Sequence, residues 1–229
     1  MVSEKSKIDS AMSLNQIIIK LHQMDAIKFG QFTLKSGIIS PVYFDLRVMV
    51  SDPKLMAAIA KIMGEMIKES KIKSDLLCGV PYTALPLATL MSVDKDIPSI
   101  IKRKEKKEYG TKKMIEGKFE AGQSCLIIED VITSGASVLE TTAELKNEGL
   151  DVTDVIVFLD REQGGKETLE EKKIRVHSVI NVKQLMEILY DAKKVSDEEK
   201  RKVEDFVKNF GTNQQQKKGT FIIYHILSK

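Results

Sequence analysis

This sequence of 229 residues has few cysteines, no long apolar run and no strong excess of one charge. Its cysteines are Cys78 and Cys125, and both fall in apolar segments. They therefore predict reduced core residues of a cytoplasmic protein rather than a disulfide framework. No stretch reaches the roughly 18 apolar residues of a membrane span, and the polar segment 1–14 does not resemble a signal peptide. The net charge of +3 argues against a broad nucleic-acid surface.

Two common nucleotide-binding motifs are also absent. The sequence has no Gly-Lys-Ser/Thr of a Walker A loop and no Gly-x-Gly-x-x-Gly dinucleotide fingerprint. No internal repeat is visible. What is present, 42 % hydrophobic and 30 % charged residues, suits one α/β domain with a sizeable core.

The most informative stretch joins an apolar strand, two acids, a small polar turn and the start of a helix. Residues 126–128 predict a strand buried on both faces, and Glu129 and Asp130 follow it. In the turn at 133–137, small residues let backbone N–H groups converge, and the helix N-terminus adds partial positive charge. The turn therefore predicts a phosphate site, with an ordinary N-capped βα turn as the alternative.

The rest of the chain predicts alternating strands and helices. Apolar runs indicate strands at 76–78, 98–102, 126–128, 152–161 and 174–180, and helical spacing indicates helices at 13–24, 53–69, 84–91, 137–147, 181–190 and 197–210. Residues 29–47 predict two short strands around a turn. The pattern predicts an α/β fold: a mostly parallel, doubly wound sheet of five strands with a small N-terminal hood from 29–47.

Lysine and arginine dominate residues 102–113, between two predicted strands. Such a run is usually a solvated loop, and a nucleic-acid patch is a second alternative. We favour a third interpretation, a lid that closes over a diphosphate at the neighbouring phosphate turn.

These motifs resemble a known family. The stretch at 126–137 is similar to the phosphoribosyl-pyrophosphate motif of the type I phosphoribosyltransferases. Arg-Lys-Glu-Lys-Lys-Glu-Tyr-Gly at 103–110 resembles the catalytic loop of the orotate phosphoribosyltransferases. Phe-Thr-Leu-Lys-Ser-Gly at 32–37 resembles the hood of the same enzymes. The resemblance covers about residues 13–210.

The resemblance implies specific residue roles. Lys107 would be the main catalytic cation, with Glu129 and Asp130 facing the reacting sugar. Phosphoribosyl pyrophosphate would be bound by Lys35, Tyr82, Thr83, Arg103, Lys104, Lys107, Tyr109, Glu129, Asp130, Val131, Ile132, Thr133, Ser134, Gly135, Ala136 and Ser137. Orotate would be bound by Lys35, Tyr43, Phe44, Thr133 and Arg161, whose planar guanidinium matches the orotate carboxylate.

The same resemblance implies Mg²⁺ held by the diphosphate and water without direct protein ligands, and a homodimer in which the loop at 103–113 completes the partner's site. Two positions depart from many bacterial members, which carry Lys where this chain has Thr83 and His where it has Tyr109. Both departures change the charge expected around the diphosphate. The turn at 79–83 is by itself equally consistent with a structural role.

Three rival interpretations remain. A purine or uracil phosphoribosyltransferase shares the phosphate motif but not the hood or basic loop, and a catalytically silent protein of this fold serves binding alone. The third is a fragment of a bifunctional enzyme, although the chain has no decarboxylase-like Asp-x-Lys-x-x-Asp. We expect one domain over 1–212 and assign no role to the tail at 213–229. His177 is expected to be structural.

Overall fold

The computed structural model describes residues 12–34, 37–105 and 113–210. Lys35, Lys107, Tyr109 and the tail at 213–229 lie outside these residues, so what the sequence predicts for them stays a prediction.

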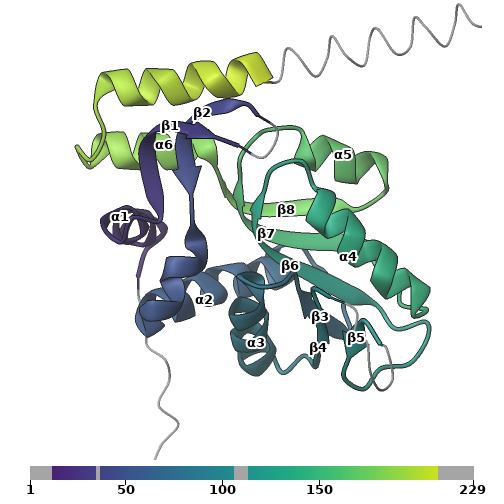
Figure 1. Cartoon of the computed structure of the whole chain (residues 1–229). Coiled ribbons are helices and arrows are strands. Elements are labelled where there is room, and N and C mark those ends of the chain that lie inside the picture. Colours follow the sequence, from purple (N-terminus) through teal and green to yellow (C-terminus); the bar gives the residue numbers. More distant parts are fainter. Residues whose placement is uncertain (1–11, 35–36, 106–112, 211–229) are drawn as a thin grey trace, which may run out of the picture.

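The predicted doubly wound α/β fold is confirmed, with one strand more than expected (Figure 1). The sheet has the order β5-β4-β3-β6-β7-β8 and is built from β3 (Leu76–Gly79), β4 (Ser99–Lys102), β5 (Ile115–Glu116), β6 (Cys125–Ile132), β7 (Asp154–Asp160) and β8 (Arg175–Asn181). All neighbours pair in parallel except β4 and β5. The five parallel strands are those predicted. The sixth is the two-residue return of the basic loop, which is too short to show a period in sequence.

Helices cover both faces of the sheet because the buried strands are apolar on both sides. Leu77 and Ile128 pack into one core with α2 (Pro53–Glu69) and α3 (Ala84–Lys95). Cys78 and Ile127 pack into a second core with α4 (Ala136–Asn147) and α5 (Gly165–Glu171). Cys78 and Cys125 are both free thiols and buried, as predicted.

Local signals in the sequence set the ends of several helices. In α1 (Leu14–Gln23), Ser13 and Gln16 form a reciprocal capping box. Asp52 caps α2, whose first residue is a proline, and Asn181 caps α6 (Val182–Asp191). These are the positions at which the sequence predicts helix starts. None of the helices that the structure describes is long and apolar enough to cross a bilayer.

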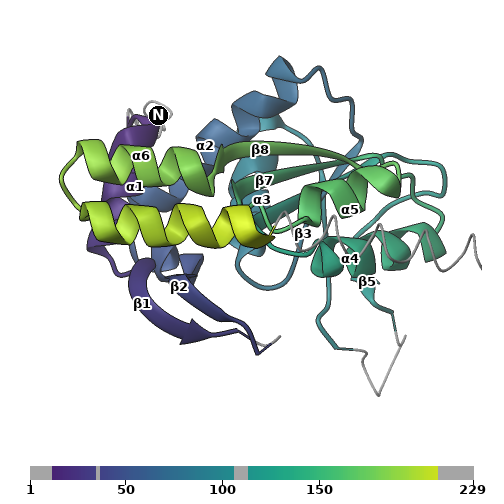
Figure 2. The ribbon, with the colours of Figure 1, turned by 90° about the horizontal axis from the view of Figure 1, so that it is seen from above.

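The hood is an antiparallel hairpin of β1 (Ile27–Thr33) and β2 (Ile39–Phe44), with a bulge between Phe29 and Phe32. Helix 197–210 lies beside this hairpin and beside α6, as Figures 1 and 2 show from two directions. Buried residues of α1 and of helix 197–210 share the core that α2 and α3 complete. The hood is thereby anchored to the main domain.

Some boundaries differ from those predicted. A 3-10 helix, η1 (Leu46–Ser51), replaces the end of the second hood strand. The strand expected to stop before the acids continues to Ile132, because Glu129 pairs with Val157 and Ile132 pairs with Asp160 in β7. The sequence did not predict α5, which has only seven residues and opens with two glycines. Partner strands, rather than local preference, decide these boundaries.

Candidate active site

The candidate site lies at the point of the sheet where the direction in which successive strands are added reverses. The chain runs from β3 outward to β4 on one side, and then from β6 through β7 to β8 on the other. The carboxyl ends of β3 and β6 are therefore neighbours, and the Val80 N–H donates to the Ile128 carbonyl across 2.9 Å. In open α/β sheets, ligands bind outside such a switch point. The turns at 79–83 and 133–137 both leave the sheet there.

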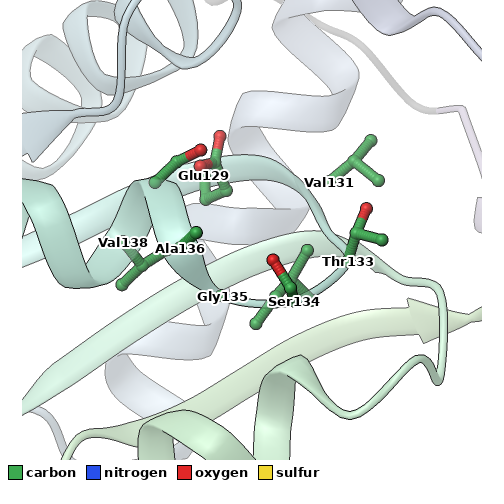
Figure 3. A pocket seen from close by; sticks show the side chains of 9 residues that line it. Glu129, Val131, Thr133, Ser134, Gly135, Ala136 and Val138 are labelled. Carbon is green, nitrogen blue, oxygen red and sulfur yellow. The ribbon is translucent and has the colours of Figure 1, made fainter. Parts of the chain in front are cut away.

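The turn at 133–137 encloses a pocket of about 70 Å³ (Figure 3). Gly135 has φ of +80°, a left-handed conformation that side chains disfavour, and it precedes α4 without any side-chain cap. The hydroxyls of Thr133, Ser134 and Ser137 make no hydrogen bond to another residue that the structure describes. The alternative of a helix capped by its own side chains is thus not realised. The turn presents backbone N–H groups, hydroxyls and a helix N-terminus to one small space, which suits a phosphate.

The two predicted acids, Glu129 and Asp130, are adjacent and make different hydrogen bonds. Glu129 is 5 % exposed and lines the pocket, and its Oε1 accepts from the Asp130 N–H at 3.0 Å. Burial, with the adjacent Asp130 charge, raises the pKa of Glu129 well above its usual range. Burial also raises the pKa of Asp130, against hydrogen bonds that include one from the Thr83 side chain. A cationic group between these carboxylates would relieve the cost of their burial.

The turn at 79–83 meets the base of the basic loop. The Tyr82 side chain is 63 % exposed, and the Lys104 Nζ lies 5.2 Å from the centroid of its ring. Arg103 donates through Nε to Glu116 at 2.8 Å, and its backbone N–H donates to the Met114 carbonyl at 2.8 Å. The Arg103 guanidinium is therefore held by β5 in this structure, while Lys104 points toward the turn expected to bind pyrophosphate.

Arg161 is the clearest anion-binding side chain of the site. Arg161 is 9 % exposed, and its Nη2 has no hydrogen-bond partner among the residues described. Burial lowers the pKa of its guanidinium, and the nearby Tyr43 partly offsets this effect. The guanidinium lies 5.3 Å from the centroid of the Phe44 ring, so the hood and the end of β7 meet at this point. A buried guanidinium with an unused N–H fits a carboxylate.

The structure brings most of the predicted residues that it describes into two adjoining groups. Glu129 and residues 131–137 form the phosphate group, and Tyr43, Phe44 and Arg161 form the base group. The Arg161 N–H donates to the Ile132 carbonyl at 3.1 Å, which joins the two groups. The Ile132 side chain itself is buried in the core beneath α4, so only its backbone can contribute to binding.

Sequence analysis missed two residues that shape the site. A Cβ on Gly165 would lie 2.6 Å from both the Ile132 side chain and the Thr133 carbonyl oxygen, so glycine is needed for α5 to pack beneath the phosphate turn. The paired glycines after Arg161 were the available signal. Arg47 is the second. The Arg47 guanidinium donates to Asp45 at 2.6 and 2.8 Å. These bonds raise the pKa of Arg47, and the negative charge of Asp130 adds a smaller contribution.

Within the described ranges, no three His, Cys, Asp or Glu side chains gather closely enough to hold a metal ion by themselves. The polar groups that surround the phosphate turn are nevertheless carboxylate and hydroxyl oxygens. Such hard oxygen donors fit Mg²⁺ that arrives with, and is largely bound by, a diphosphate.

Known proteins of similar sequence support the resemblance seen in the motifs. Residues 49–208 match the family described as "Phosphoribosyl transferase domain". The uridine 5′-monophosphate synthase of Bos taurus is 47 % identical over 194 residues, which are 85 % of this chain and 40 % of that protein. The orotate phosphoribosyltransferase of Caenorhabditis elegans is 42 % identical over 183 residues, 80 % of this chain and 81 % of that one.

A solved structure of the UMP synthase of Leishmania donovani superimposes with a TM-score of 0.79 at 29 % identity, covering 86 % of this chain and 43 % of that one. The chain therefore spans less than half the length of the two synthases, but most of the length of the Caenorhabditis elegans transferase.

Proposed function

The chain belongs to the phosphoribosyltransferase family, within its orotate branch, and from that premise we propose that it is an orotate phosphoribosyltransferase of de novo pyrimidine synthesis. It moves the 5-phosphoribosyl group from phosphoribosyl pyrophosphate to orotate, giving orotidine 5′-monophosphate and pyrophosphate. The observation that carries the choice of base is the buried Arg161 guanidinium with an unused N–H beside Phe44. Orotate carries a carboxylate on a flat ring, whereas adenine, hypoxanthine and uracil carry none.

Binding places the two substrates on the two groups of the site. The 5′-phosphate enters the 70 Å³ pocket of the turn at 133–137, and Glu129 and Asp130 take the ribose hydroxyls. Orotate lies between the hood and the end of β7, with its carboxylate on Arg161 and its ring against Phe44. This arrangement holds the base nitrogen near the anomeric carbon of the sugar.

The reaction breaks the bond from the anomeric carbon to the diphosphate and forms a bond from that carbon to the orotate nitrogen. Positive charge develops on the sugar as the diphosphate leaves, and the buried Glu129 and the half-buried Asp130 face it. Tyr82, Thr83 and Lys104 lie at the turn that receives the diphosphate, and Lys107 of the basic loop neutralises the leaving group. Mg²⁺ supplies additional positive charge to the diphosphate when it is bound.

We further propose that the enzyme acts in the cytoplasm as a homodimer, with each basic loop completing the partner's site. Subunit mixing tests the dimer. Lys107→Ala and Asp130→Asn should each have little activity alone, but random reassembly creates mixed dimers with one intact site. About a quarter of the wild-type activity should return, since half the dimers are mixed and half their sites are intact. No recovery after verified exchange would place each loop over its own site.

The reaction itself is tested by following orotate absorbance with the purified chain, phosphoribosyl pyrophosphate and Mg²⁺, beside parallel reactions with adenine, hypoxanthine or uracil. Loss of orotate that requires all three components supports the proposal. Consumption of another base would retain the fold and overturn the assignment of the base site. Absence of any reaction, with phosphoribosyl pyrophosphate still bound, would favour the silent binding protein.

A further inference from the structure

A groove of about 560 Å³ separates the hood from helix 197–210 and contains none of the residues assigned to catalysis or substrate binding. Its apolar lining comes from Phe29, Ile39 and Pro41 of the hairpin and from Phe206 of the helix. Ile39 is 61 % exposed, which is unusual for a large apolar side chain next to other apolar groups. The Phe206 and Phe210 rings contact each other at a tilt of 55°, with centroids 5.9 Å apart, so the apolar strip continues to the end of the helix.

The charged rim of the groove is acidic in effect. Glu199, Lys202 and Asp205 line it, but the Lys202 Nζ lies 2.6 Å from Glu198 and is thereby partly neutralised. The Asp205 carboxylate forms no hydrogen bond or ion pair with another residue that the structure describes. A basic, apolar segment would complement both the lining and the rim.

We propose that the groove is the docking site of the chain's own C-terminal segment, residues 211–229. This segment begins directly after Phe210, where the apolar strip ends. It contains lysines at 217, 218 and 229 and no acidic residue, and residues 221–227 are apolar and β-prone apart from His225. Its composition is therefore the one that the groove complements, and docking buries an apolar stretch that would otherwise be open to aggregation.

The length of the segment permits the return. The groove follows the helix from Glu199 to Asn209, about 15 Å at 1.5 Å per residue. Residues 211–219 can span up to about 30 Å when extended, enough to reverse direction and lay part of residues 220–227 along the groove. β1 also pairs with β2 alone in the described sheets, so its other edge has no strand partner among them.

Docking at this place braces the hood. β1 and β2 line the groove, and β2 carries Tyr43 and Phe44 to the base site. A two-stranded hairpin is marginally stable alone, and a third apolar segment would hold it against helix 197–210. The segment thus supports the geometry of the base site without touching substrate. The inference rests on the groove and the sequence of the segment, so it stands or fails independently of the proposed reaction.

The test measures the accessibility of the groove in the full chain. Ile39→Cys places a thiol in the groove, and the native Cys78 and Cys125 are buried. Its rate of maleimide labelling is compared with that of the same protein carrying Ile223→Asp in the C-terminal segment. We expect the Ile223→Asp change to speed labelling about tenfold or more, because it opens the docked state. Asp205→Lys should also speed labelling, through repulsion of the basic segment.

Val93→Cys provides the control, since Val93 is 79 % exposed on α3 and should label equally in both backgrounds. Protection of Ile39→Cys that is independent of protein concentration supports docking within one chain. Protection that grows with concentration would assign the groove to a second copy and overturn the proposal. Rapid labelling that Ile223→Asp does not change would overturn it as well.

Discussion

The Arg161 guanidinium lies 5.3 Å from the centroid of the Phe44 ring, although the two residues are far apart in the sequence. Phe44 ends the second hood strand, and Arg161 directly follows β7. The contact closes one wall of the site and keeps a buried cation next to an aromatic face. The Arg161 Nη2 has no hydrogen-bond partner among the residues described. The proposal for base binding therefore rests mainly on this residue and its contact with Phe44.

Glu129→Gln should stabilise the free protein while abolishing turnover. Burial and the adjacent Asp130 raise the pKa of Glu129, so the folded state holds its proton to higher pH than the unfolded state. Folding therefore loses stability as pH rises from the ordinary carboxyl pKa toward the raised one. Glutamine does not titrate, so the melting temperature of the Glu129→Gln variant should exceed that of the wild type by about 2 °C or more at neutral pH.

The advantage of Glu129→Gln should shrink as pH falls from the raised pKa of Glu129 toward the ordinary carboxyl range, and vanish below that range, since both side chains are then neutral. Thermal unfolding measured across pH 4 to 8 checks this, with the exposed Glu120→Gln as the matched control. A melting temperature that falls in Glu129→Gln at neutral pH would mean that the buried carboxylate is paired and stabilising.

Gly165→Ala should weaken binding of phosphoribosyl pyrophosphate. The added Cβ would lie 2.6 Å from the Thr133 carbonyl oxygen, so the phosphate turn or α5 must move. Overpacking of this kind costs about 1–3 kcal/mol, and calorimetric titration should show an affinity roughly tenfold lower. Glu167→Ala, on the exposed face of the same helix, should leave the affinity unchanged. Equal affinities for all three proteins would show that α5 does not support the turn.

Lys107→Ala should preserve binding of phosphoribosyl pyrophosphate and lower kcat. A preorganised cation aimed at the leaving group stabilises the transition state by about 3–4 kcal/mol, so the loss should be roughly a hundredfold to a thousandfold. Stopped assays with saturating substrates measure kcat, and the exposed Lys118→Ala serves as control. Near-normal turnover in Lys107→Ala would remove this residue from the mechanism.

The sequence predicted the parts of the fold that depend on nearby residues. Ser13 and Gln16 cap one helix, and Asp52 with Pro53 starts another, because these contacts lie within one turn. His177 was expected to be structural, and its Nε2 indeed lies 2.8 Å from the Asp154 carboxylate, far from the phosphate turn along the same sheet. These features follow from local chemistry.

What the sequence did not predict depends on long-range packing. Glu129 lies inside a strand because Val157 pairs with it, and β5 exists because Lys102 pairs with Ile115. The residues of the site could be named from the motif, yet the burial of Arg161 and its unused N–H depend on where the hood packs. The closeness of Gly165 to Thr133 likewise appears only when α5 is in place.

The most direct measurement is the KM for orotate in Arg161→Gln, with Arg201→Gln, an exposed cation of helix 197–210, as control. Loss of a buried guanidinium–carboxylate pair costs about 3 kcal/mol, so KM for orotate should rise roughly a hundredfold. KM for phosphoribosyl pyrophosphate should stay within about twofold, because the phosphate turn is intact. An unchanged KM for orotate, or an equal rise for both substrates, would contradict the account.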